Sequence, residues 1–246
     1  MVAESTTKRS WSSALSHTEI TLSEDPRPKV RPTSSSTIQW PVLRHLGHPR
    51  VQAPPEISFS KVLEERRSSR VMQYERLRTV VSAIAFATQS RFNNEVNGIK
   101  RYRRPSPSAG ALHCIEIILI DWRGSLRAFH CAPDDAAITQ LYIQNPEEAL
   151  RFRDRCQTIL PNARGTAILF SANVERVEKS YDHFQSLIWR DAGALLQTLF
   201  LTFTAYGAEF CPLGLLGNEM LVALGLEKHL IGAGVALVGR SIPIKL

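Results

Sequence analysis

The sequence predicts one α+β domain built in layers of helices and strands. Short β-branched runs are separated by segments of helical periodicity, two of the runs are joined by a glycine turn, and a long apolar stretch lies near the end. The chain has 246 residues and 43% of them are hydrophobic, so it can bury a substantial core.

The first 55 residues differ in composition from the rest of the chain. They are rich in Ser, Thr, Pro and charge, and they lack a sustained period of either kind. We expect a disordered or loosely docked arm at 1–55, followed by one globular domain at 56–246. An apolar cluster at 38–46 offers a contact for a partner subunit, with a plain tail as the alternative. The start of the chain lacks the apolar run of a signal peptide, so a cytoplasmic location is expected.

Two helices open the domain. Ser58 is placed to cap a short helix whose last turn leads into the arginine-rich loop at 66–70. A second helix is expected over 76–88, where apolar residues recur every three or four positions: Leu77, Val80, Val81, Ile84 and Ala85.

A hairpin and a further helix–strand pair follow. The apolar run at 115–120 is too hydrophobic for an edge strand, and a turn at Gly124 joins it to a return strand at 126–130. The pattern then predicts a helix over 147–159 and a core strand over 167–170.

The long apolar segment is predicted to be a buried helix over 184–206, with Gly207 at its C-terminal cap. Its uncharged part is too short to cross a membrane. A last helix over 218–224 and a last strand over 235–238 complete the fold. The long helix is more apolar than one small domain usually covers, which favours a homodimer.

Charge and cysteine content narrow the function only a little. The net charge of +7 favours anionic partners without choosing among them, and a basic nucleic-acid binder would rest on this charge alone. Four scattered cysteines without paired spacing predict buried, reduced thiols rather than a metal site or disulfide framework. Gly232-Ala233-Gly234 lacks the dinucleotide-binding pattern, and the isolated pair His113 and Glu116 is a poor metal site.

Three loops combine residues suited to a planar, phosphate-bearing cofactor. Residues 66–70 offer guanidinium and hydroxyl donors for a phosphate, with a solvated basic helix end as the alternative. Residues 107–110 are small enough for the backbone to approach a flat ligand, with an ordinary turn as the alternative. Residues 211–214 could present a backbone N–H to a ring nitrogen, with a plain helix-to-helix connection as the alternative.

The order of these motifs resembles the nitroreductase superfamily, and within it the branch of SagB-type dehydrogenases. The resemblance spans about residues 57–241 and includes Asp191-Ala192-Gly193 on the long helix. It implies an α+β fold with a central, mostly antiparallel sheet flanked by helices. It also implies a homodimer that binds FMN at the subunit interface.

The resemblance assigns roles to individual residues. The phosphate would be held by Arg66, Ser68 and Arg70, with Arg240 as a further cation. Residues along the flavin, contributed by the other subunit, would be Pro107, Ser108 and Ala109. The backbone near flavin N5 would come from Leu213 and Gly214.

The implied chemistry is hydride transfer at the flavin. Azoline-oxidising relatives have an adjacent Lys-Tyr pair, whereas this chain has Lys179 and Tyr181 separated by Ser180, which makes those two the candidate catalytic residues. Ala194 also stands where many relatives have His. The first hypothesis is an oxidase or dehydrogenase acting on a natural-product or peptide-derived intermediate. The alternatives are an NAD(P)H-dependent reductase, or a catalytically silent member that acts as a binding partner in a biosynthetic complex.

Overall fold

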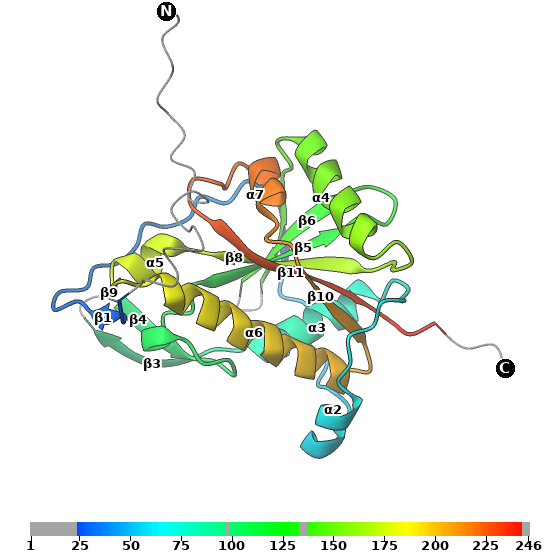
Figure 1. Cartoon of the computed structure of the whole chain (residues 1–246), viewed down its shortest axis with the longest axis horizontal. Helices are drawn as coiled ribbons and strands as arrows, with labels where there is room; N and C mark the ends of the chain where they lie inside the picture. Colours follow the sequence, from blue (N-terminus) through cyan, green and yellow to red (C-terminus); the bar gives the residue numbers. More distant parts are fainter. Residues whose placement is uncertain (1–23, 97–98, 133–136, 243–246) are drawn as a thin grey trace, which may run out of the picture.

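A computed structural model describes residues 24–96, 99–132 and 137–242, and in it a seven-stranded sheet lies between two helical layers (Figure 1). The strand order is β10-β11-β8-β5-β6-β7-β2, and every neighbouring pair is antiparallel. Its strands are β2 (Val42–Gly47), β5 (Ile115–Asp121), β6 (Arg127–Cys131), β7 (Ile138–Leu141), β8 (Thr166–Ala172), β10 (Glu209–Leu213) and β11 (Ile231–Gly239). The predicted α+β class with a central antiparallel sheet is confirmed.

Helices cover both faces of the sheet. Helices α3 (Leu77–Thr88) and α6 (Gln185–Ala205) contribute to one core, and α4 (Pro146–Ile159) and α7 (Asn218–Leu224) contribute to the other. Two further helices are short: α2 (Phe59–Glu65), which contacts α6, and α5 (Val174–Glu178). Figure 1 places α6 lengthwise across the molecule, so this one helix connects distant parts of the domain.

The central strand β5 explains why two cores form. Its side chains alternate, with Ile117 and Leu119 in the core beneath α6 and Ile118 and Ile120 in the core beneath α4 and α7. Because successive side chains of a strand point to opposite faces, the uninterrupted apolar residues at 117–120 require cover on both sides. The prediction that this run is not an edge strand is confirmed.

The predicted helices agree closely with the structure. The Ser58 side chain accepts a hydrogen bond from Lys61 N and caps α2, as expected. Gly207 follows the end of α6 with φ +68°, the left-handed conformation that glycine adopts most easily. The β5–β6 hairpin is also confirmed.

Part of the segment that was expected to be a disordered or loosely docked arm forms strands. Strand β2 pairs with β7 as the last strand of the main sheet, and β1 (Arg27–Pro28) pairs with β9 (Tyr181–Asp182). The ring of Trp40 stacks on that of His130 with 3.7 Å between centroids. Strands β1 and β2 are thus paired with the domain, while all six residues of β2 remain exposed. The boundary at residue 55 stays a prediction, and residues 1–23 lie outside the described part of the chain.

Other segments also differ from the predictions. Residues 211–214 were expected to form a loop, either one that presents backbone to a cofactor or a plain connection, but they belong largely to β10, an edge strand that pairs with β11. Pro212 is compatible with this position because an edge strand need not donate every backbone N–H. A hairpin of β3 (Arg91–Val96) and β4 (Ile99–Arg103) was not predicted, and a short 3-10 turn, η1 (Ala109–Ala111), follows it.

Candidate functional site

The arginine-rich loop lies along the free edge of β10. Ser68 forms a parallel bridge with Phe210, and Ser69 N donates to the Phe210 carbonyl at 3.2 Å. Arg66 directly follows α2, and its guanidinium lies over the Phe200 ring of α6 at 4.9 Å. The loop is therefore held by backbone bonds to the sheet while its side chains remain half-buried or exposed.

The loop carries uncompensated positive charge. Within the described residues, Arg66, Arg67 and Arg70 form no ion pair with a carboxylate. Burial raises the pKa of the neighbouring Cys211 thiol, and the charge of Arg70 acts in the opposite direction. Three guanidinium groups without a counter-ion are chemically suited to bind a phosphate.

Arg240 follows β11 and is bonded to the segment that leaves the arginine-rich loop. Its backbone exchanges hydrogen bonds with Gln73 at 2.8 and 3.0 Å, and its Nη2 is 3.2 Å from Gln73 Oε1. The chain that leaves the arginine-rich loop is therefore fastened to the end of β11, which Arg240 follows.

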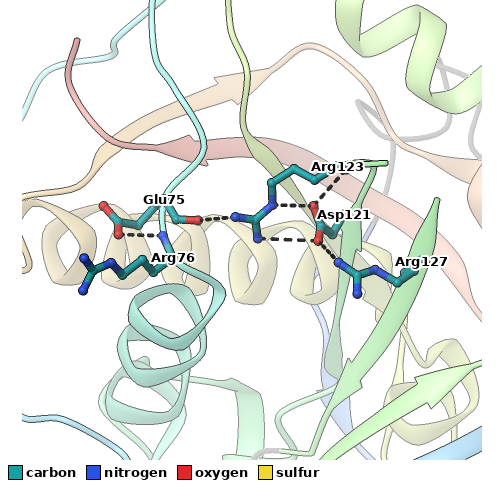
Figure 2. A network of polar contacts seen from close by, with 5 residues as sticks. All are labelled: Glu75, Arg76, Asp121, Arg123 and Arg127. Carbon is teal, nitrogen blue, oxygen red and sulfur yellow. Dashed lines mark hydrogen bonds and ion pairs between the residues drawn. The ribbon is translucent and has the colours of Figure 1, made fainter. Parts of the chain in front are cut away.

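A buried carboxylate stabilises the next residues of this segment (Figure 2). Asp121, at the end of β5, accepts from Arg123 Nε at 3.0 Å and from Arg127 Nη2 at 2.7 Å. Arg123 Nη1 in turn donates to the Glu75 carbonyl at 3.0 Å. Asp121 thus connects the sheet to the segment between the arginine-rich loop and α3.

The end of β10 contains two more of the predicted residues. Leu213 is buried and pairs with Val235, and Gly214 is exposed with open space at the position of a Cβ atom. At about 3.3 Å per residue, Leu213 lies roughly 10 Å along the strand from Phe210, where the arginine-rich loop is attached. The loop and the strand end together form one elongated edge.

A second group of predicted residues surrounds Asp191 on α6. The Asp191 carboxylate accepts hydrogen bonds from the Ser108 hydroxyl and, at 3.1 Å, from Ala109 N. Ser108 Oγ accepts from His113 N at 2.8 Å, and the Cys114 thiol is 3.7 Å from Asp191. Burial raises the pKa of Asp191, and the hydrogen bonds from Ser108 and Ala109 offset part of this rise. Asp191 therefore fixes the conformation of the 107–110 turn.

The two candidate catalytic side chains, those of Lys179 and Tyr181, contact different parts of the structure. A Cβ atom added at Gly110 would lie 2.7 Å from the Tyr181 hydroxyl, so Tyr181 is adjacent to the 107–110 turn. Lys179 instead forms an ion pair with Glu175 at 2.6 Å. The structure thus brings Tyr181, but not the Lys179 ammonium, to the turn that carries Pro107, Ser108 and Ala109.

The two groups of predicted residues lie at different points along α6. Asp191 marks the group at 107–110, and Phe200 marks the arginine-rich loop. Nine residues separate them, which is about 14 Å along a helix at 1.5 Å per residue. Within one chain the structure brings Arg66, Ser68 and Arg70 to β10, and Ser108 and Ala109 to Asp191, but it does not join the two sets.

Sequence reasoning missed a buried cluster beside the second group. Glu116 is 3.2 Å from His130 Nε2 and 3.2 Å from Arg176 Nη2. Burial acts to raise the pKa of Glu116, yet the hydrogen bond with His130 and the charge of Arg176 lower it overall. Arg176 also donates to the His113 carbonyl at 2.9 Å. The isolated pair His113 and Glu116 gave the only sequence signal.

The described part of the chain lacks a membrane-spanning helix and a cluster of metal ligands. No helix there is long and apolar enough to cross a membrane. Its His, Cys, Asp and Glu side chains form no group of three or more that could hold a metal ion.

No family model and no curated protein matches the chain, but solved structures do. A putative nitroreductase from Ralstonia eutropha JMP134 aligns with a TM-score of 0.59 at 14% identity, covering 89% of this chain and all of that one. A putative nitroreductase from Anabaena variabilis ATCC 29413 aligns with a TM-score of 0.60 at 17% identity, covering 85% of this chain and 45% of that one.

A third similar structure is the E. coli microcin synthetase McbBCD complex with truncated pro-MccB17 bound. The TM-score is 0.53 at 18% identity, and the alignment covers 80% of this chain and 77% of that one. The chain therefore has a nitroreductase-like fold. The expected resemblance to the nitroreductase superfamily is confirmed at the level of the fold.

Proposed function

We propose that this protein is an FMN-dependent oxidoreductase of the nitroreductase type and of its SagB-type branch. The observation that carries the proposal is the arginine-rich loop at the edge of β10, whose guanidinium groups have no carboxylate partner among the described residues. The fold supports the same conclusion, because the similar solved structures include nitroreductases.

The residues present fit the phosphate end of FMN. Arg66 and Arg70 supply permanent charge, and the exposed Ser68 supplies a hydroxyl beside them. Arg240, at the end of β11, contacts Gln73 of the segment that follows the loop and adds a cation. When bound, the flavin supplies the hydride-transfer chemistry, and these residues hold and orient it. Leu213 and Gly214 would present backbone to the ring edge near N5.

A homodimer would complete this site. The 107–110 turn lies about 14 Å along α6 from the arginine-rich loop of the same chain. A second protomer can supply its own Pro107, Ser108 and Ala109 to the flavin held by the first. Exposed apolar side chains on α2, Phe59 and Leu63, are available for such a contact.

The favoured reaction is the oxidation of a natural-product or peptide-derived intermediate in the cytoplasm. The similarity to the McbBCD complex, which has a truncated pro-MccB17 bound, supports the peptide-derived choice. In this proposal Tyr181 is the side chain that moves a proton, because its hydroxyl lies at the 107–110 turn. An NAD(P)H-dependent reductase remains the second enzymatic choice.

The ion pair of Lys179 with Glu175 favours a different candidate, a catalytically silent binding partner in a biosynthetic complex. In that case the protein would take up flavin without turnover, because the lysine of the expected pair is engaged elsewhere.

The first test is the absorbance spectrum of the purified protein, with the flavin identified after denaturation. We expect bound FMN, and a colourless protein that takes up no added FMN would contradict the proposal. Anaerobic addition of NADPH then separates the two enzymatic choices, since prompt bleaching indicates a reductase. A flavin that NADPH does not reduce indicates the oxidase or the silent protein.

A further inference from the structure

A second cavity, of about 200 Å³, lies between the N-terminal segment and strand β4. Residues 33–35 form one wall, and β4 and the region of α5 form the others. This volume is large enough for several water molecules or a small organic molecule. The cavity is separate from the arginine-rich loop, whose residues do not line it.

The lining of this cavity is basic. Lys100, Arg104 and Arg176 contribute to it, and no Asp or Glu does. Two carboxylates that contact residues of this region already have partners: Glu116 bonds Arg176 and His130, and Glu175 bonds Lys179 and Ser36. Arg176 is thus paired with Glu116, and Lys100 faces Glu95 across the β3–β4 ladder. The lining itself contributes basic groups and no carboxylate, so a ligand inside meets positive charge.

Hydroxyl groups add neutral donors to these cations. Thr33, Ser34 and Ser35 line the cavity on one side, and Ser180 lines it on the other. Ser180 is only 5% exposed, and its Oγ has no hydrogen-bond partner among the described residues. Leaving a buried hydroxyl unpaired costs free energy, which an accepting ligand can recover.

Apolar side chains complete the wall. Ile99, Tyr102 and Leu112 line the cavity together with the polar groups. A molecule that fits must therefore combine an apolar part with an oxyanion. Guanidinium, ammonium and hydroxyl donors together suit a carboxylate or a phosphate group.

The N-terminal segment is fastened in place as one wall. Lys29 N donates to the Ser180 carbonyl at 2.9 Å, and Thr33 N donates to the Lys179 carbonyl at 3.3 Å. The Ser36 hydroxyl bonds the Glu175 carboxylate. These contacts hold residues 33–35 opposite β4, so the wall exists before a ligand arrives.

The cavity is next to the proposed catalytic turn. Arg104 lines both this cavity and the small one beside Pro107, Ser108 and Asp191. Ser180 lies in sequence between Lys179 and Tyr181. A molecule anchored here is thus close to the 107–110 turn and to Tyr181, the side chain to which we assign proton transfer.

We propose that this cavity binds the oxyanion group, a carboxylate or a phosphate, of the small molecule on which the protein acts. The role in substrate binding rests on the proposed function, whereas the binding of an anion does not. The N-terminal segment is then a structural part of the substrate site.

Calorimetric titration with benzoate and with inorganic phosphate tests the proposal, with benzyl alcohol as the uncharged analogue of benzoate. We expect at least one anion to bind. For that anion, Lys100→Gln weakens binding by about tenfold or more, and Ser180→Ala weakens it by a smaller factor. Lys100 is exposed on β4, so this variant tests binding without disturbing the core. Lys228→Gln, at an exposed site outside the cavity, is the matched control and should leave the affinity unchanged.

Three results would overturn the proposal: neither anion binds, benzyl alcohol binds as tightly as benzoate, or Lys100→Gln leaves the affinity of the bound anion unchanged. Benzoate binding that Lys100→Gln weakens identifies a carboxylate ligand. Phosphate binding that Lys100→Gln weakens identifies a phosphorylated one, whereas phosphate bound at the arginine-rich loop is insensitive to this variant. FMN titration of the same samples separates this inference from the proposed function. A protein that takes up FMN but neither anion contradicts the anion site alone, and a protein that binds an anion but no FMN contradicts the flavin assignment alone.

Discussion

Removing the charge of Asp121 should destabilise the whole domain. Its carboxylate is 0% exposed and accepts from Arg123 and Arg127, whose side chains are 31% and 41% exposed. Breaking a buried ion pair costs about 3–5 kcal/mol. The two guanidinium groups can still reach water, so we expect about 3 kcal/mol for Asp121→Asn, the lower end of that range. For a chain of this size that loss lowers Tm by roughly 6–12 °C.

The assay is urea unfolding followed by circular dichroism, with Asp154→Asn as the matched control. Asp154 pairs with Arg153 at the surface and is 60% exposed, so its substitution should change the unfolding free energy by less than about 1 kcal/mol. If Asp121→Asn lowers the unfolding free energy by no more than this control, the network in Figure 2 does not stabilise the domain. An Asp121→Asn variant that binds FMN more weakly but keeps its full unfolding free energy would also contradict the stabilising role of Asp121.

Two further predictions concern the core. A Cβ atom at Gly239 would lie 2.5 Å from the Gln73 carbonyl oxygen, so Gly239→Ala should cost roughly 1–3 kcal/mol through overpacking, measured by urea unfolding. Burial raises the pKa of the Cys131 and Cys156 thiols to about 12. These thiols ionise near pH 9 only in the unfolded chain. Their contribution to the unfolding free energy should therefore be complete below pH 9. Between pH 9 and 12 the unfolding free energy should fall by about 1.4 kcal/mol per pH unit for each thiol.

Controls for both predictions exist in the chain. Gly193→Ala, in α6 with open space around the Cβ position, should be neutral or slightly stabilising. Equal effects of the two glycine substitutions would contradict the packing argument. The alkaline loss should be smaller in Cys131→Ala, and a slope unchanged by this variant would rule out the thiols as its source.

The sequence predicted those elements whose burial leaves a periodic pattern. The helices at 77–88 and 185–205 each bury one apolar stripe, and β5 buries both faces, so their patterns are strong. Strand β2 was missed because all six of its residues are exposed, which leaves no alternation to detect. Strand β10 was expected to be a loop, since Pro212 argues against a strand wherever an edge position is not known.

The candidate site was predicted only in pieces. Local motifs identified the loops at 66–70 and 107–110, but their distance along α6 depends on the packing of segments far apart in the chain. The cavity beside Ser180 was missed for the same reason. Its walls come from 33–35, β4 and α5, and no single segment carries the combination of cations and hydroxyls that lines it.

The most direct test of the central claim compares FMN with riboflavin, which lacks the phosphate, in equilibrium titrations of Arg66→Gln. If Arg66 binds the phosphate, the substitution should weaken FMN binding by about 10- to 100-fold and leave riboflavin binding nearly unchanged. Lys228→Gln, at an exposed site outside the arginine-rich loop, serves as the control and should change neither affinity. Equal losses for FMN and riboflavin, or no loss for either, would contradict the assignment of this loop to the phosphate.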